Sequence, residues 1–165
     1  MSIEVTYAVT GTIVETLTGP FVSAADATTT TNGLNIAGVL NASSTVPATK
    51  YAAGRLTLSS GSGTLDLTVL PGRTADEVVD GTGLKLQLLI LHNRSTNANK
   101  ITITKGASNG IGLAASNDTW TLTLSPDQTV GLYLKDAGPD IASDKKTLDI
   151  SGTGSQELDY EIVMG

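Results

Sequence analysis

Strict alternation of apolar and polar residues is the main pattern along the chain. It first appears in residues 3–9, where Ile3, Val5, Tyr7 and Val9 share one face. A period of two residues is typical of a strand with one buried face, because successive side chains point to opposite sides of a sheet. Further segments show the same pattern, at residues 65–69, 84–91, 101–104, 120–124, 130–134, 148–150 and 158–164.

The segment 84–91 changes character along its length. Its first half alternates, with Lys85 and Gln87 between leucines, whereas residues 88–91 are apolar without a break. A strand that is apolar on both faces has to be covered on both faces. We therefore expect a central strand here that is buried from two sides.

Turn-forming residues separate most of these segments. Glycine permits positive φ, and proline fixes φ near the value needed at the start of a turn. The turn signals lie at residues 61–63, 71–72, 80–83, 109–110, 125–127, 138–139 and 152–154. Strands at short intervals, without helical stretches between them, predict an all-β fold. We expect a two-sheet antiparallel sandwich, jelly-roll-like, with about ten strands.

Two regions lack the alternation and guide the division into domains. Residues 23–32 are small and polar and predict a loop or extended linker, and residues 41–54 predict a long ordered loop, with a short helical turn over 48–53 as the alternative. The predicted domains are 1–33, an N-terminal β-hairpin arm and Thr-rich linker, and 34–165, the β-sandwich. In this division the hairpin spans residues 3–17; the alternative is that the whole arm is integral to the sandwich.

Composition and charge exclude several classes of protein. The chain has 165 residues and no cysteine, so disulfides, thiolate metal sites and a cysteine nucleophile are impossible. Its net charge of −6 argues against a nucleic-acid partner, because binding to phosphates requires an excess of basic side chains. The longest apolar run is residues 88–91, far short of the roughly 18 residues of a membrane helix, so we expect no membrane partner.

His92 is the one histidine and the first candidate for catalysis. A triad would need it as a base beside a serine or threonine nucleophile and an orienting carboxylate, and no local signature of such a triad surrounds it. We interpret His92 as a histidine at a strand end, hydrogen-bonded to the neighbouring loop. We expect no enzyme, no catalytic residue and no cofactor.

Two acidic clusters are the candidates for a cation. Asp136, Asp140 and Asp144 are spaced four residues apart, and Asp76, Glu77 and Asp80 form the second cluster. Neither cluster has the alternating oxygen ligands and the terminal glutamate of a calcium-binding loop. We interpret both as solvated turns and assign no metal site, with a hard cation at a subunit contact as the alternative.

Aromatic side chains are scarce, which bears on carbohydrate recognition. Tyr7, Trp120 and Tyr160 fall on the core faces of their predicted strands, whereas Tyr133 falls on the opposite face and is expected to point outward.

Residues 3–9 either complete a sheet of their own chain, which we favour, or add a strand to the exposed edge of a neighbour.

Taken in order, seven short elements carry a resemblance to a known group of proteins. They are YAVTGT (7–12), PATK (47–50), GTLDLT (63–68), GTGLK (81–85), NANKIT (97–102), GASNG (106–110) and SGTG (151–154). In this order they resemble small β-rich virion structural proteins of tailed bacteriophages and prophages, often encoded near capsid genes. The resemblance extends over most of the chain.

The resemblance implies a virion structural protein that decorates or cements the capsid and stabilises the shell. Its implied partners are the major capsid protein and other copies of itself, with a trimer favoured, and its implied location is the capsid surface after synthesis in the host cytoplasm. It implies no catalytic or binding residue. Two alternatives remain open, namely a glycan-binding module of the lectin or adhesin kind and a tail or baseplate subunit.

Overall fold

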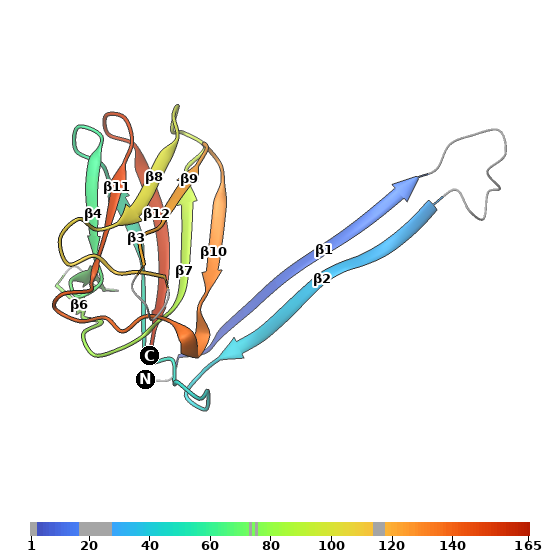
Figure 1. Cartoon of the computed structure of the whole chain (residues 1–165), viewed down its shortest axis with the longest axis horizontal. Coiled ribbons are helices and arrows are strands. Elements are labelled where there is room, and N and C mark those ends of the chain that lie inside the picture. Colours follow the sequence, from blue (N-terminus) through green and yellow to red (C-terminus); the bar gives the residue numbers. More distant parts are fainter. Residues whose placement is uncertain (1–2, 17–27, 73, 75, 114–117) are drawn as a thin grey trace.

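The computed structural model describes residues 3–16, 28–72, 74, 76–113 and 118–165. It confirms an all-β fold built on two four-stranded antiparallel sheets, ordered β10-β7-β12-β3 and β4-β11-β8-β9 and packed against each other (Figure 1). The eight sandwich strands are β3 (Lys50–Thr57), β4 (Ser62–Asp66), β7 (Leu86–Asn93), β8 (Ile101–Lys105), β9 (Thr121–Leu124), β10 (Thr129–Tyr133), β11 (Thr147–Ser151) and β12 (Glu157–Met164). The other elements are β1 (Val5–Thr16), β2 (Thr28–Leu40), β5 (Leu70–Pro71), β6 (Val78–Val79) and the 3-10 turn η1 (Lys135–Ala137).

The sandwich strands pair in a nested order. β3 pairs with β12, β4 with β11, β7 with β10 and β8 with β9, so that the first strand meets the last and the two middle strands meet each other. This is the pairing of one long hairpin folded over two sheets. Lateral contacts of β12 with β7 and of β11 with β8 then complete the two sheets.

The alternating residues of the sequence form the core between the sheets. Leu89 and Leu91 of β7 face Ile101 and Ile103 of β8 in one buried cluster, and each of these four side chains is fully buried. The run predicted over residues 65–69 is wrong at its end, because β4 stops at Asp66 and Val69 is 63% exposed. The Asp66 carboxylate accepts a hydrogen bond of 2.9 Å from the backbone N–H of Thr68, and this local bond turns the chain out of the strand.

Strand β7 is buried on both faces, as its sequence predicts. Leu89 and Leu91 lie in the core between the sheets. On the opposite face, Leu88 belongs to a second, smaller cluster with Leu40 and Val163. This second cluster is the place where the N-terminal arm meets the sandwich.

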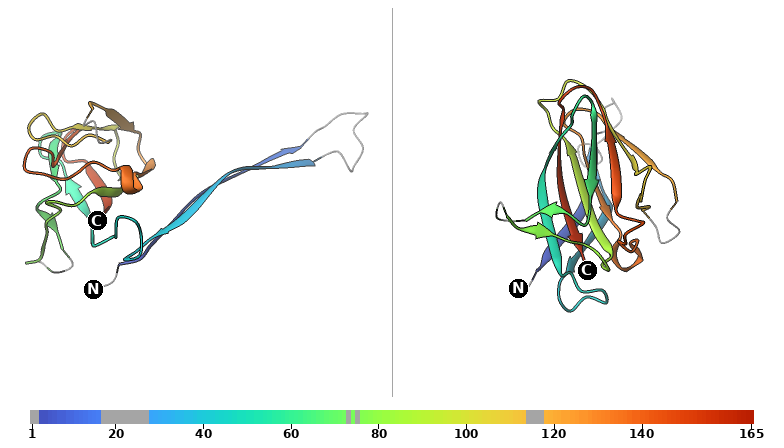
Figure 2. Two further views of the ribbon diagram at one scale, coloured as in Figure 1. Left: turned by 60° about the horizontal axis from the view of Figure 1, so that its bottom comes forward. Right: turned by 90° about the vertical axis from the view of Figure 1, so that its left-hand side faces the viewer.

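The arm is a two-stranded antiparallel hairpin of β1 and β2, and it projects away from the sandwich (Figure 1 and the left view of Figure 2). The N-terminal segment therefore pairs within its own chain, in a sheet separate from the other two. The register runs from Val5 opposite Leu40 to Thr16 opposite Thr28, with a shift between Thr10 and Thr12.

Two expectations about this region need correction, namely the hairpin over residues 3–17 and the linker over residues 23–32. Residues 3–16 do not fold back on themselves, because their partner is β2; residue 17 lies outside the described residues. Residues 28–32, expected to be linker, belong to β2, since branched threonines fit a strand once a partner is present, whereas residues 23–27 lie outside the described residues. β2 also crosses the predicted boundary at residue 33, and the division into two domains stays a prediction.

The loop expected over residues 41–54 is shorter than predicted. β3 begins at Lys50 and pairs with β12 along its whole length, which also excludes a helical turn over residues 50–53. Gly54 lies opposite Tyr160, whose ring covers the glycine so closely that an added Cβ would lie 2.6 Å from the Tyr160 hydroxyl. The sequence pattern did not predict β3, because a small residue such as Gly54 fits a strand here only once Tyr160 of the partner strand lies over it.

Replacing Gly54 with valine tests this packing. We expect Gly54→Val to lower the free energy of unfolding by about 1–3 kcal/mol, because the new side chain has to displace the Tyr160 ring. Urea denaturation measures the change. The matched control is Gly131→Val in β10, where an added Cβ meets nothing closer than Ile90 Cγ1 at 4.0 Å. The control should unfold at the same urea concentration as the wild type or slightly higher, and equal losses in both variants would contradict this account.

Candidate functional site

The outer face of the sheet β10-β7-β12-β3, turned away from the core, consists of three cross-strand rows. Each row takes one residue from each of the four strands, in register across the sheet. We call them the charged row, Thr129–His92–Asp159–Arg55, the middle row, Gly131–Ile90–Glu161–Ala53, and the apolar row, Tyr133–Leu88–Val163–Tyr51. The character of the face therefore changes from ionic to apolar over three rows.

The apolar row holds the root of the arm. Tyr7 of β1 stacks on Tyr133, with ring centroids 3.8 Å apart and an interplanar angle of 27°. The Tyr7 ring also lies over Gly38 of β2, where a Cβ would approach the Tyr7 hydroxyl to 2.2 Å. Leu40 and Val163 are fully or almost fully buried at this contact. Because Gly38 has no side chain, the Tyr7 ring lies over the hairpin and at the same time contacts Tyr133 of the sheet.

The contact changes the acidity of Tyr133. Burial raises the pKa of its phenol, and the neighbouring Tyr7 hydroxyl and Asp136 carboxylate raise it further. Tyr133 therefore stays neutral to a higher pH than an exposed tyrosine. Its outward direction follows the sequence prediction, but the arm covers it, so it is not a free aromatic platform for a sugar.

The middle row forms the floor of an open groove. One hollow of about 300 Å³ lies between the arm root and the sheet, and a second of about 390 Å³ lies over the charged end of the same face. The two hollows share Ile90 and Glu161, whereas Gly131 lines only the first and Ala53 only the second. We call the two adjoining hollows, which together cover the four residues of the middle row, the sheet groove.

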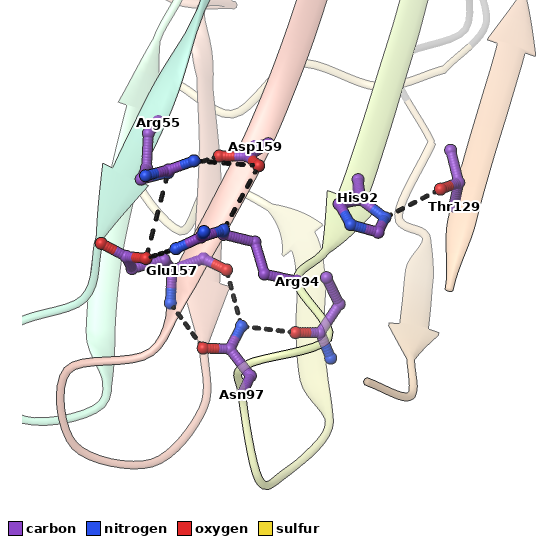
Figure 3. Close-up of polar contacts among 8 residues, drawn as sticks. Arg55, His92, Arg94, Asn97, Thr129, Glu157 and Asp159 are labelled. Atoms are coloured by element: carbon purple, nitrogen blue, oxygen red, sulfur yellow. Dashed lines mark hydrogen bonds and ion pairs between the residues drawn. The ribbon is translucent and has the colours of Figure 1, made fainter. Parts of the chain in front are cut away.

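Two residues of the charged row, Arg55 and Asp159, belong to a four-residue ion-pair cluster with Arg94 and Glu157 (Figure 3). Arg55 Nε lies 2.6 Å from Asp159 Oδ1 and 4.0 Å from Glu157 Oε2. Arg94 pairs with the same Glu157 oxygen, and its Nε lies 3.6 Å from Asp159 Oδ2. Each arginine thus contacts both carboxylates, and the charges of the cluster balance.

Asn97 connects this cluster to the end of the sandwich. Its Nδ2 donates hydrogen bonds of 2.6 Å to Asn93 Oδ1 and to the Glu157 carbonyl, and its Oδ1 accepts one of 3.0 Å from the Glu157 backbone N–H (Figure 3). Asn93, itself fully buried, donates to the Leu124 carbonyl over 2.9 Å. The two amides therefore fix the loops that join β7 to β8 and β9 to β10.

His92 lies next to these groups but has a different partner. Its Nδ1 lies 2.8 Å from the Thr129 hydroxyl on β10, in the register pair of the two strands (Figure 3). The sequence interpretation placed this partner on a neighbouring loop, whereas the structure places it on the adjacent strand. The neighbouring Asp159 carboxylate contacts Arg55 and Arg94. Hydroxyl, imidazole and carboxylate therefore do not form a triad in this arrangement.

The acidic residues singled out in the sequence are spread over turns. Asp140 pairs with Lys85 over 2.7 Å, and Asp136 lies in η1 next to Lys135. Asp80 Oδ1 accepts hydrogen bonds from the Thr82 backbone N–H and hydroxyl, which fixes its turn and lowers the Asp80 pKa. Within the described residues, the structure brings no three acidic or histidine side chains together in a way that would hold a metal ion.

No protein-family model and no curated protein sequence matches this chain. Among the residues that the structure describes, no helix has the length and apolarity needed to cross a membrane.

Removing the Asn97 amide tests the loop network. We expect Asn97→Ala to lower the free energy of unfolding by about 2 kcal/mol, because it leaves buried groups of Asn93 and Glu157 without partners. Urea denaturation measures the effect, with the exposed Thr123→Ala on the far sheet as control. A loss no larger than that of the control would show that the network adds little to stability.

The Tyr133 contact predicts a dependence of stability on alkaline pH. Because the folded protein raises the pKa of Tyr133 above its unfolded value, the stabilisation is complete below about pH 10 and is lost as the pH rises above it. The fall in unfolding free energy between pH 8 and pH 10.5 should therefore be larger in the wild type than in Tyr133→Phe. The remaining tyrosines are common to both proteins, so equal falls would contradict the prediction.

Proposed function

We propose that this chain is a structural protein of a bacteriophage particle that decorates the capsid and cements neighbouring capsid subunits as a homo-oligomer. The observation that carries the proposal is the arm. Two strands of 12 and 13 residues pair with each other, and the hairpin projects away from the sandwich (Figure 1). A two-stranded hairpin is marginally stable alone in water, so such an arm is best explained by packing against another protein.

The edges of the arm support the same conclusion. Proteins protect exposed strand edges with lysine, proline or a bulge. Among the described arm residues there is neither lysine nor proline, and the register shift near Thr10 is the one irregularity of the pairing. Val9 and Val39, on opposite faces of the hairpin, are 58% and 46% exposed. These edges and faces suit contact with another protein chain.

The topology and the sequence resemblance agree with this proposal. We infer that the sandwich is a jelly roll, because its strands pair from the outside inward. The ordered elements of the sequence resemble capsid decoration and cement proteins, which supports the major capsid protein and other copies of this chain as partners, with a trimer favoured. The proposed location is the outer surface of the virion after synthesis in the host cytoplasm.

The proposal is tested by adding the purified protein to undecorated capsids. We expect it to sediment with the capsids and to raise the temperature at which they are disrupted. The double variant Val9→Asp/Val39→Asp should lose both effects, because it places charge on both faces of the arm. The matched control is Val69→Asp/Val78→Asp, two exposed valines of the sandwich region at 63% and 62% exposure.

Two outcomes would contradict the proposal. Wild-type protein that neither binds capsids nor stabilises them would remove the capsid function. Assembly into open rings or stacked tubes, measured by light scattering and electron microscopy, would favour a tail or baseplate subunit, because a decoration protein should stop at a small closed oligomer.

A further inference from the structure

Gly131 is a glycine that its own fold does not require. It lies within β10, its φ is not positive, and an added Cβ would meet only Ile90 Cγ1, at 4.0 Å. The other glycines of the sandwich strands lie under neighbouring side chains, as Gly54 lies under Tyr160. Glycine weakens a strand, and inside a strand it often marks the close approach of another backbone. The space above Gly131 therefore points to a partner outside the chain.

The rest of the middle row extends this space across the sheet. Gly131, Ile90, Glu161 and Ala53 are register partners in that order. Because Gly131 and Ala53 at the two ends of the row are small, the surface of the sheet is low there, and the sheet groove lies along the row. The width of four strands is enough for a short extended segment to lie over Ile90 between its two sides.

Glu161 gives the groove its charge. Its side chain is exposed, and no ion pair joins it to any residue in the described part of the chain. The nearest carboxylate along β12 is Asp159, whose charge Arg55 and Arg94 balance. The groove is apolar towards the arm root and polar towards the charged row, and its floor carries one carboxylate without an ion pair among the described residues. Such a groove is complementary to an extended segment that carries one basic side chain.

The charge also argues against the arm of a second copy as the occupant. The first basic residue of the chain is Lys50, so the whole arm lacks lysine and arginine, and it carries Glu4 and Glu15. An arm placed in the groove would therefore leave Glu161 without a counterion.

We propose that the sheet groove binds an extended segment of a partner protein of a different kind, with its backbone over Gly131 and a lysine or arginine on Glu161. This inference deepens the proposed function. It rests on that function because it takes the partner to be a capsid protein. The arm and the groove then have separate roles, the arm reaching a distant contact and the groove holding a segment next to the sandwich.

Fluorescence anisotropy on the full chain tests the groove without capsids. The probe is a short labelled peptide of alternating valine and threonine with a lysine at its centre, compared with the same peptide carrying glutamate. We expect the lysine peptide to bind about tenfold tighter or more, because a hydrogen-bonded charge pair contributes that much. Glu161→Gln should remove most of this preference, and Gly131→Val should weaken binding of the lysine peptide about tenfold by filling the groove.

The control variant is Thr123→Val on the outer face of the other sheet, which should bind as the wild type does. Failure of both peptides to bind, equal binding of both peptides, or unchanged binding by Gly131→Val would overturn the proposal. Loss of self-association in Gly131→Val, with peptide binding unchanged, would instead place a second copy in the groove and overturn it as well. Because the assay contains no capsid, its failure is distinguishable from a failure of the capsid function.

Discussion

The burial of β7 on both faces is the constraint on which the rest of the structure depends. Its inner leucines form the core between the sheets, and its outer Leu88 forms the seat of the arm. Because the outer face would otherwise expose Leu88 and Ile90 to water, the chain has to supply a second layer. That layer is the root of the hairpin, so the arm is fixed by the same strand that organises the sandwich.

Much of the sandwich follows from the sequence because its information is local. The alternation around Ile101 and around Tyr160 places each side chain inside or outside whatever strand lies beside it. The unbroken run at residues 88–91 likewise predicts burial from two sides. Strand ends are harder to predict from the sequence, since the end of β4 depends on one hydrogen bond between Asp66 and Thr68.

The arm contact and the sheet groove were less predictable, because each depends on pairs of residues that are far apart in the sequence. Gly54 and Gly38 weaken a strand pattern when they are seen alone, and they become favourable once Tyr160 and Tyr7 lie over them. Glu161 and Gly131 are far apart in the sequence and share a row only through two strand pairings. Gly131, inside the alternating segment 130–134, is a sign of the groove that the sequence alone does not interpret.

The attachment of the arm has a mechanical consequence. Both strands of the hairpin enter the sandwich side by side, at Val5 and Leu40, which are register partners. Tension on the arm passes from β2 along the chain into β3, whereas β1 is held to the sandwich by side-chain packing at the root. The Tyr7–Tyr133 stack and the Leu40 cluster are therefore the contacts that separate first when the arm is pulled away from the sheet.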